Sequence, residues 1–180
     1  MKIVSSGLFF EWQKALQGDC VEKAEKKYEA VSHMYKEQDP ALNGTTMYTV
    51  YSIEEPPLPG HLLWGLSVLH PVTVQGECNM TRGHFHQDRQ CQEYYWCMQG
   101  EGLLMLMDEQ GHCWAEEMKE GTLHKIDGTI AHRLVNTGDC DLEVVACWPS
   151  TSGHDYEAIE EKPFPIRVFK KGDQLIYEQL

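Results

Sequence analysis

The chain has 180 residues, of which 42% are hydrophobic and 24% are charged, as in an ordinary globular domain with a substantial core. Its 28 acidic residues outnumber its 15 Lys and Arg residues, which gives a formal net charge of −13. A chain this acidic is a poor candidate for binding nucleic acid or anionic membranes, and we expect neither as a partner. No apolar run reaches transmembrane length, and the first residues show no signal-peptide pattern.

The cysteines indicate a reducing compartment. There are 7 of them, an odd number, and they show neither a paired pattern nor the Cys-x-x-Cys spacing of a structural zinc site. Free thiols of this kind are usual where disulfides do not form. We therefore expect the protein to be cytoplasmic.

The first 45 residues differ from the rest and predict an amphipathic helix. The segment 19–22 resembles an N-terminal capping box, and the pattern ends before Asp39-Pro40. Between these points, apolar side chains recur at helical spacing, at Val21, Ala24, Tyr28, Val31 and Tyr35. We expect residues 1–45 to be a helical extension packed on the main domain.

From residue 46 onward the pattern predicts strands. They cover residues 47–53, 62–70, 93–98, 103–107, 112–118, 121–126, 142–148, 166–169 and 174–177. Glycine-containing turns at 99–102 and 171–173 predict hairpins between the strands on either side of them. Many short strands at regular intervals are typical of an all-β sandwich or barrel, so we expect one domain over residues 1–180 with a β-barrel over 46–180.

Residues 81–97 contain the strongest functional signal. His84 and His86 are two residues apart, so on an extended strand both imidazoles point to the same face, and Glu93 follows on the next predicted strand. Two histidines and a carboxylate form a ligand set for a divalent transition metal with open coordination positions. His132 is a possible fourth ligand.

These residues resemble the motifs of the cupin superfamily. The first motif corresponds to His84, His86, Glu93 and Gly100, and the second corresponds to Gly121, His132 and Asn136. The resemblance implies a jelly-roll β-barrel whose cavity holds a metal and one small ligand.

A closer resemblance is to the cupin-type glucose-6-phosphate isomerases first known from archaea. The matching segments are 48–54, 81–86, 93–95, 131–138 and 153–162, and the Gly-His-Asp-Tyr segment at 153–156 is absent from general cupins. The resemblance implies an enzyme of glycolysis and gluconeogenesis that interconverts glucose 6-phosphate and fructose 6-phosphate. It also implies a homodimer with one divalent metal per subunit, Fe2+ before Mn2+, Ni2+, Co2+ or Zn2+. The chain departs from the family at Trp148, where tyrosine is expected.

Carried over to this chain, the resemblance assigns roles around the metal. Glu93 and His154 are the candidate catalytic residues, although a metal-assisted hydride shift would need no base. The expected substrate-binding residues, most of them around the phosphate, are Tyr48, Ser67, Thr81, Gly83, Tyr95 and Tyr156. Arg82 is left out of this set, because strand alternation places it on the face opposite Gly83.

Two other functions fit the same ligands. A non-haem iron dioxygenase on a cupin scaffold uses two histidines and one carboxylate for oxygen chemistry. A phosphosugar-binding module without catalysis would have the same cavity. Within the isomerase hypothesis, mannose 6-phosphate is a possible further substrate.

Overall fold

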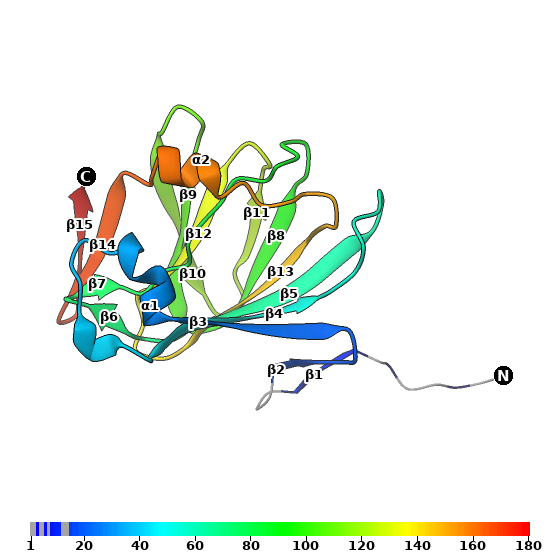
Figure 1. Cartoon of the computed structure of the whole chain (residues 1–180), viewed down its shortest axis with the longest axis horizontal. Coiled ribbons are helices and arrows are strands. Elements are labelled where there is room, and N and C mark those ends of the chain that lie inside the picture. The colour runs from blue at the N-terminus through cyan, green and yellow to red at the C-terminus, as the bar shows by residue number, and fades with distance from the viewer. Residues whose placement is uncertain (1–2, 4–5, 7, 12–14) are drawn as a thin grey trace.

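Antiparallel strands make up most of the computed structural model, which describes residues 3, 6, 8–11 and 15–180 (Figure 1). The strands are β1 (Phe9–Glu11), β2 (Ala15–Gln17), β3 (Val21–Lys27), β4 (Thr46–Ile53), β5 (Leu62–Leu69), β6 (Thr73–Val74), β7 (Glu77–Cys78), β8 (Glu93–Gln99), β9 (Glu101–Met107), β10 (Cys113–Lys119), β11 (Leu123–Ile126), β12 (Ala131–Asn136), β13 (Leu142–Pro149), β14 (Ile166–Lys171) and β15 (Gln174–Gln179). The helices are α1 (Tyr28–Val31), α2 (Glu157–Glu161) and the 3-10 turns η1 (Ser32–Met34) and η2 (Pro40–Leu42).

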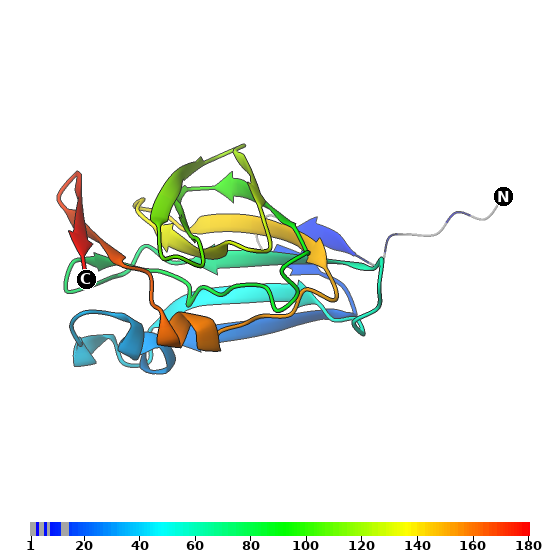
Figure 2. The ribbon, with the colours of Figure 1, turned by 90° about the horizontal axis from the view of Figure 1, so that it is seen from above.

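A six-stranded sheet in the order β11-β8-β13-β5-β4-β3 forms one wall of the barrel. The three-stranded sheet β10-β9-β12 forms much of the opposite wall, and the main hydrophobic core lies between the two. A further sheet, β15-β14-β7-β6, lies at the end of the molecule away from β1 and β2 (Figures 1 and 2). The predicted all-β cupin barrel is therefore confirmed, with each predicted strand present to within a few residues at its ends.

The segment 79–86, which carries His84 and His86, lies against the wall formed by β10, β9 and β12. It runs beside β12 through isolated bridges between Met80 and Val135 and between His84 and His132. Backbone hydrogen bonds of 3.1–3.2 Å join His84 and His132 in both directions. Two histidines 48 positions apart in the chain are thereby held side by side.

The predicted N-terminal helix is wrong. Residues 21–27 form β3, which pairs along its length with β4 at the edge of the six-stranded sheet, and α1 has only four residues. The side chains from Glu22 to Lys27 are exposed, as suits an edge strand whose charges discourage pairing with another chain. Hydrogen bonding to β4 satisfies the backbone that a helix would otherwise have satisfied, and this tertiary pairing outweighs the helical spacing.

The expected hairpin at 99–102 is also wrong. β8 pairs with β11 and β13, whereas β9 pairs with β10 and β12, so the turn carries the chain from one wall to the other. Gly100 has φ +84° and lies against the backbone of Asp141, which leaves no room for a side chain. The predicted C-terminal hairpin is confirmed as β14 and β15.

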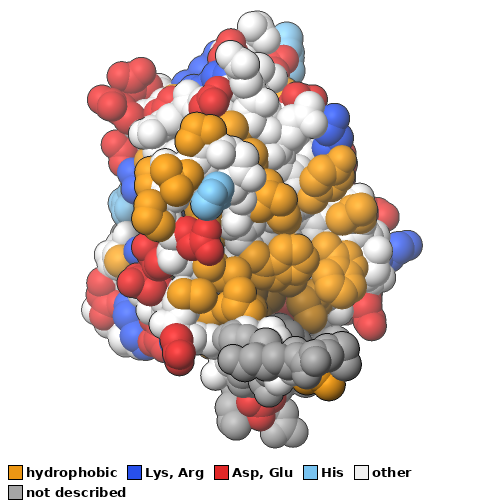
Figure 3. Space-filling view, turned by 90° about the vertical axis from the view of Figure 1, so that its right-hand side faces the viewer, with side chains coloured by type: hydrophobic (Ala, Val, Ile, Leu, Met, Phe, Trp, Pro, Cys, Tyr) orange, Lys and Arg blue, Asp and Glu red, His pale blue; other side chains and the backbone are white. Residues whose placement is uncertain are grey.

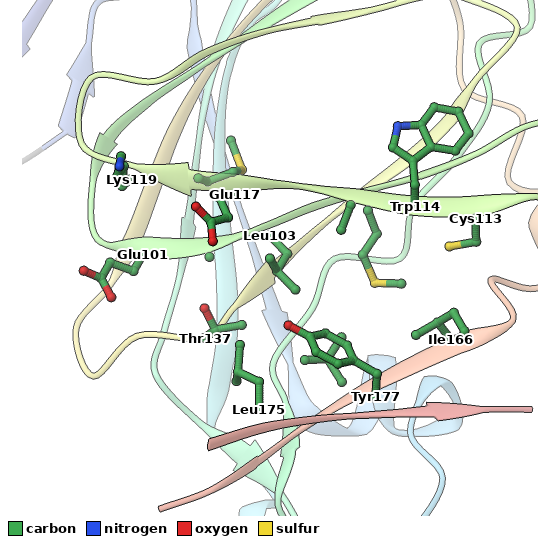
Figure 4. A pocket seen from close by; sticks show the side chains of 15 residues that line it. Glu101, Leu103, Cys113, Trp114, Glu117, Lys119, Thr137, Ile166, Leu175 and Tyr177 are labelled. Carbon is green, nitrogen blue, oxygen red and sulfur yellow. The ribbon is translucent and has the colours of Figure 1, made fainter. Parts of the chain in front are cut away.

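A groove of about 690 Å³ lies between β9, β10 and the β14–β15 hairpin (Figure 4). Leu103, Ile166 and Leu175 contribute to its lining, together with the aromatic rings of Trp114 and Tyr177. It contains none of the predicted site residues, although it is larger than the cavity at the histidines. None of the helices in the described part of the chain is long and apolar enough to cross a membrane.

Candidate metal centre and active site

His84, His86, Glu93 and His132 converge inside the barrel. One potential ligand atom from each lies within 4.8 Å of the others. The Oε2 atom of Glu93 lies 3.1 Å from Nε2 of His86 and 3.1 Å from Nε2 of His132. Two ligands at right angles on one ion, each about 2.1 Å from it, lie about 3 Å apart, so these separations suit neighbouring positions around a metal. All but His84 are buried.

The outer hydrogen bonds of two histidines leave their inner nitrogens available. Nδ1 of His86 lies 2.9 Å from the carbonyl oxygen of Cys91, and Nδ1 of His132 lies 3.2 Å from that of Ile130. Such bonds select the tautomer whose Nε2 carries a lone pair for a metal. Nε2 of His132 is buried and has no aligned hydrogen-bond partner, despite its proximity to Glu93. This orphaned atom is accounted for if a divalent cation binds here.

The pKa shifts of His84 and Glu93 suit a cation, whereas the pKa of His86 is raised, because its contact with Glu93 outweighs the opposing effect of burial. Burial lowers the pKa of His84 well below its usual range, and the neighbouring His132 and His154 act in the same direction. Burial would raise the pKa of Glu93, but the imidazoles of His132 and His86 outweigh it and the pKa is lowered. A neutral imidazole beside an ionised carboxylate is the state that binds metal.

The cluster opens into a cavity of about 290 Å³. His84, Glu93 and His132 line it, while His86 lies behind them with 1% of its surface exposed. The ring centroid of His154 is 4.3 Å from that of His84, and the rings of His154 and Tyr156 are stacked at 5.7 Å. Burial also lowers the pKa of His154. His154 therefore lies beside the candidate metal ligands and lines the same cavity.

The predicted substrate-binding residues all line this same cavity. They are Tyr48, Ser67, Thr81, Gly83, Tyr95 and Tyr156. The hydroxyl oxygen of Thr81 accepts a 3.0 Å hydrogen bond from the backbone of Leu134, which leaves its own proton free to donate. Gly83 has φ +77°, and a Cβ there would lie 2.9 Å from the Phe164 ring and 3.0 Å from Cβ of Arg133. Only glycine fits this turn before His84.

Arg82 lines the cavity as well, contrary to the prediction from strand alternation. The positive φ of Gly83 breaks the alternation, because residues 82–84 do not form a regular strand. The Arg82 guanidinium lies 4.4 Å from the centre of the Tyr156 ring and pairs with Glu160. Among the described residues that line this cavity it is the sole Lys or Arg, and the other charged ones are Glu54, Glu55 and Glu93.

Trp148 is another lining residue that the sequence analysis did not assign. Its indole ring fills the space above Gly65, where a Cβ would lie 2.8 Å from Cη2. The small residue on β5 and the large one on β13 are therefore complementary. The pairing of Leu63 with Trp148 between these strands could have suggested this only once the register was known.

The barrel, with its cluster of three histidines and one carboxylate, defines a cupin with a candidate metal site. Oxalate decarboxylase from Bacillus subtilis is similar to 84% of this chain with a TM-score of 0.52 and 15% sequence identity, and the match covers 31% of that protein. At this identity the likeness supports the fold alone.

The sequence comparisons are more specific. The family model "Glucose-6-phosphate isomerase (GPI)" matches residues 23–175. The glucose-6-phosphate isomerase of Thermococcus litoralis is 34% identical over 148 residues, which are 82% of this chain and 75% of that protein. The corresponding protein of Thermococcus kodakarensis is 36% identical over 147 residues, with the same coverage. The chain belongs to the glucose-6-phosphate isomerase family.

Proposed function

We infer that the protein is a glucose-6-phosphate isomerase, which interconverts glucose 6-phosphate and fructose 6-phosphate in glycolysis and gluconeogenesis. The observation that carries this inference is the cluster of His84, His86, Glu93 and His132, which opens into a cavity that His154 also lines. The family membership favours the isomerase over a dioxygenase or a non-catalytic sugar-binding module.

We propose that the four clustered residues hold one divalent ion. When bound, such an ion polarises the carbonyl group of the open-chain sugar and stabilises negative charge on its oxygens. Fe2+ is the proposed metal, with Mn2+, Ni2+, Co2+ and Zn2+ as alternatives for the same nitrogen and oxygen ligands. Metal analysis of protein purified from its own organism distinguishes them.

His154 is the proposed catalytic base. Its low pKa, due first to burial, keeps the imidazole neutral near pH 7, so that it can take a proton from C1 or C2 of the sugar and return it. Glu93 is the second candidate, but its Oε2 atom lies between His86 and His132, and a ligand role engages it fully. Stacking on Tyr156 fixes the plane of the His154 ring.

The substrate phosphate binds at the mouth of the cavity. We propose that Thr81 donates its hydroxyl proton and Gly83 its backbone N–H, and that the hydroxyls of Tyr48, Ser67, Tyr95 and Tyr156 complete the substrate contacts. Arg82 adds a positive charge for the phosphate dianion. In a protein of net charge −13, this local charge is needed to hold an anionic substrate.

A coupled assay with fructose 6-phosphate tests the proposal. Protein stripped with a chelator should lose isomerase activity and regain it with Fe2+ or Mn2+. The variant His154→Gln should keep its metal, and its kcat should fall by about 10²–10⁴-fold.

In deuterated water, deuterium at C1 or C2 of the product supports a proton transfer, and its absence supports a hydride shift. A metal-loaded protein that is inactive with fructose 6-phosphate but consumes oxygen would overturn the proposal. Mannose 6-phosphate is tested in the same assay.

We also propose that the protein is a homodimer. The outer face of the six-stranded sheet exposes large apolar side chains on neighbouring strands, with 41–65% of each exposed, at Leu62, Trp64, Tyr94, Trp96 and Leu123. Figure 3 shows hydrophobic side chains gathered on one face of the molecule. A patch of this kind marks an association site, and a second copy is the usual occupant. Light scattering should give a dimer mass for the wild type and a monomer mass for Trp96→Lys; a wild-type monomer would contradict the proposal.

Two further proposals concern the whole chain. Residues 1–180 form one cupin domain, because β3 in the N-terminal part pairs with β4 of the barrel.

The protein acts in the cytoplasm, consistent with free cysteines at all 7 positions. Fluorescence microscopy of a tagged full-length chain tests the location.

A further inference from the structure

A second polar cavity, of about 330 Å³, lies on the other side of the wall that carries the metal ligands. Successive residues of β12 point to opposite faces, so His132 points into the barrel and Arg133 points outward into this cavity. Segment 163–168, η1 and α2 cover it from outside. The two cavities therefore share a wall and are lined by different side chains of β12.

Three arginines line the second cavity, and two of them, Arg133 and Arg167, do not line the first. The Arg133 guanidinium donates to the Met80 sulfur at 3.1 Å and to the carbonyl oxygen of Arg82 at 2.6 Å, and it lies 4.5 Å from the centre of the Phe164 ring. Arg167 donates to Glu77 at 2.7 Å and to the carbonyl oxygen of Met34 at 3.0 Å. The Nε atoms of both arginines are buried without a hydrogen-bond partner among the described residues.

The charges in this cavity do not balance around Arg133. The two glutamates that line the cavity already have partners, since Glu77 pairs with Arg167 and Glu160 pairs with Arg82. Across residues 15–180, no carboxylate forms an ion pair with Arg133, whose partners are a thioether, a carbonyl and an aromatic face. A guanidinium does not lose its proton at physiological pH, so a buried one without a counter-charge is costly. This arrangement favours an anion.

The rest of the cavity lining is largely apolar. It includes Met105, Val135, Ile159 and Phe164. We propose that this cavity is a binding site for a small organic anion, whose carboxylate or phosphate group pairs with Arg133 and Arg167 and whose apolar part lies against these side chains. The site is distinct from the metal cavity, which Arg133 and Arg167 do not line.

The test is a binding experiment on the metal-loaded, full-length protein, with a saturating equilibrium mixture of glucose 6-phosphate and fructose 6-phosphate to occupy the active site. The probes are benzoate, inorganic phosphate and, as a neutral analogue of the first, benzamide. Thermal unfolding and calorimetric titration measure binding. At ten times its dissociation constant, a bound anion should raise the Tm by about 3–6 °C, with one site per chain.

Arg133→Met should abolish this rise, and Arg89→Met is the matched control. Arg89 also lies over an aromatic ring, that of Phe85 at 4.6 Å, but it pairs with Asp155 at 2.8 Å and lies outside this cavity. Without any probe, Arg133→Met should be at least as stable as the wild type, because it removes an unpaired buried charge. If it does not fold, Arg167→Met should show the same loss of binding.

The two anions separate the possible ligand types. A shift with benzoate alone supports a carboxylate ligand with an apolar body, and a shift with phosphate alone supports a phosphorylated one. The variant Ile159→Phe, which fills the cavity and leaves both arginines in place, should weaken benzoate binding by more than tenfold. The proposal is overturned if neither anion binds, if benzamide gives an equal shift, or if both arginine variants bind as the wild type does.

Discussion

The two faces of β12 carry different basic side chains, and only those on the inner face lie beside a carboxylate. On the inner face, His132 lies with His84 and His86 around the single carboxylate of Glu93. On the outer face, the Arg133 guanidinium has no carboxylate partner among the described residues, although Glu77 and Arg167 form a pair nearby. The same strand thus separates a site built from side chains that can lose their protons from one built from side chains that cannot.

This difference explains what each side can bind. Burial lowers the pKa of His84, and the neighbouring histidines act in the same direction, so its ring is neutral and presents a lone pair to a cation. Guanidinium groups stay charged and offer only donors, so they require an anion. Alternation along one strand therefore places opposite ligand preferences on either side of a single wall.

The largest expected effect is on the inner face. His132→Ala should release the metal, because it removes a ligand that is 1% exposed and that lies 3.1 Å from Glu93. Since a metal supplies several kcal/mol to stabilising charge in the transition state, we expect isomerase activity to fall by on the order of 10³-fold or more. Metal analysis and the coupled assay measure both quantities. Arg133→Met, one residue along, should keep its metal; full activity in His132→Ala would contradict the proposed ligand set.

The next effect contrasts two buried carboxylates. Glu77→Gln leaves Arg167 with a charge it cannot release, and it should lower the free energy of unfolding by about 3–5 kcal/mol. Glu93→Gln in metal-free protein should cost about 1 kcal/mol or less, because an imidazole, unlike a guanidinium, can release its proton near physiological pH. Urea denaturation of both variants makes the comparison. Equal losses would show that the ability of histidine to deprotonate does not matter here.

A smaller effect is expected at Arg82, which lines both cavities. Arg82→Gln should raise the KM for fructose 6-phosphate about tenfold through the loss of one charge-assisted contact, with kcat little changed. The matched variant Glu160→Gln removes the partner of Arg82 and should leave the KM equal or lower. An unchanged KM in Arg82→Gln would mean that the hydroxyl and backbone groups bind the phosphate unaided.

Much of this architecture can be predicted locally. The strands of the barrel follow from alternating apolar residues and from glycine turns, and β4, β5, β8 and β13 lie close to their predicted bounds. The spacing of His84, His86 and Glu93 likewise predicts a ligand set, because extended backbone places residues two apart on one face. The structure brings these three residues together with His132.

The errors share a physical origin. At 21–27, helical spacing competes with pairing to β4, and the decision depends on a strand about 25 residues away. At Gly100, the turn joins two walls because the partners of β8 and β9 lie elsewhere in the chain. Periodicity describes one segment at a time and contains no information about its partner.

The sequence by itself determined the all-β class and the types and spacing of the candidate metal ligands, since these depend on side-chain chemistry and on the two-residue period of a strand. The tertiary structure alone decided which strands pair, that Arg82 lines the cavity at the histidines, and that the half-buried Arg133 has no carboxylate partner among the described residues. Each of those outcomes depends on long-range packing around a particular backbone turn or strand register, and no local pattern encodes it.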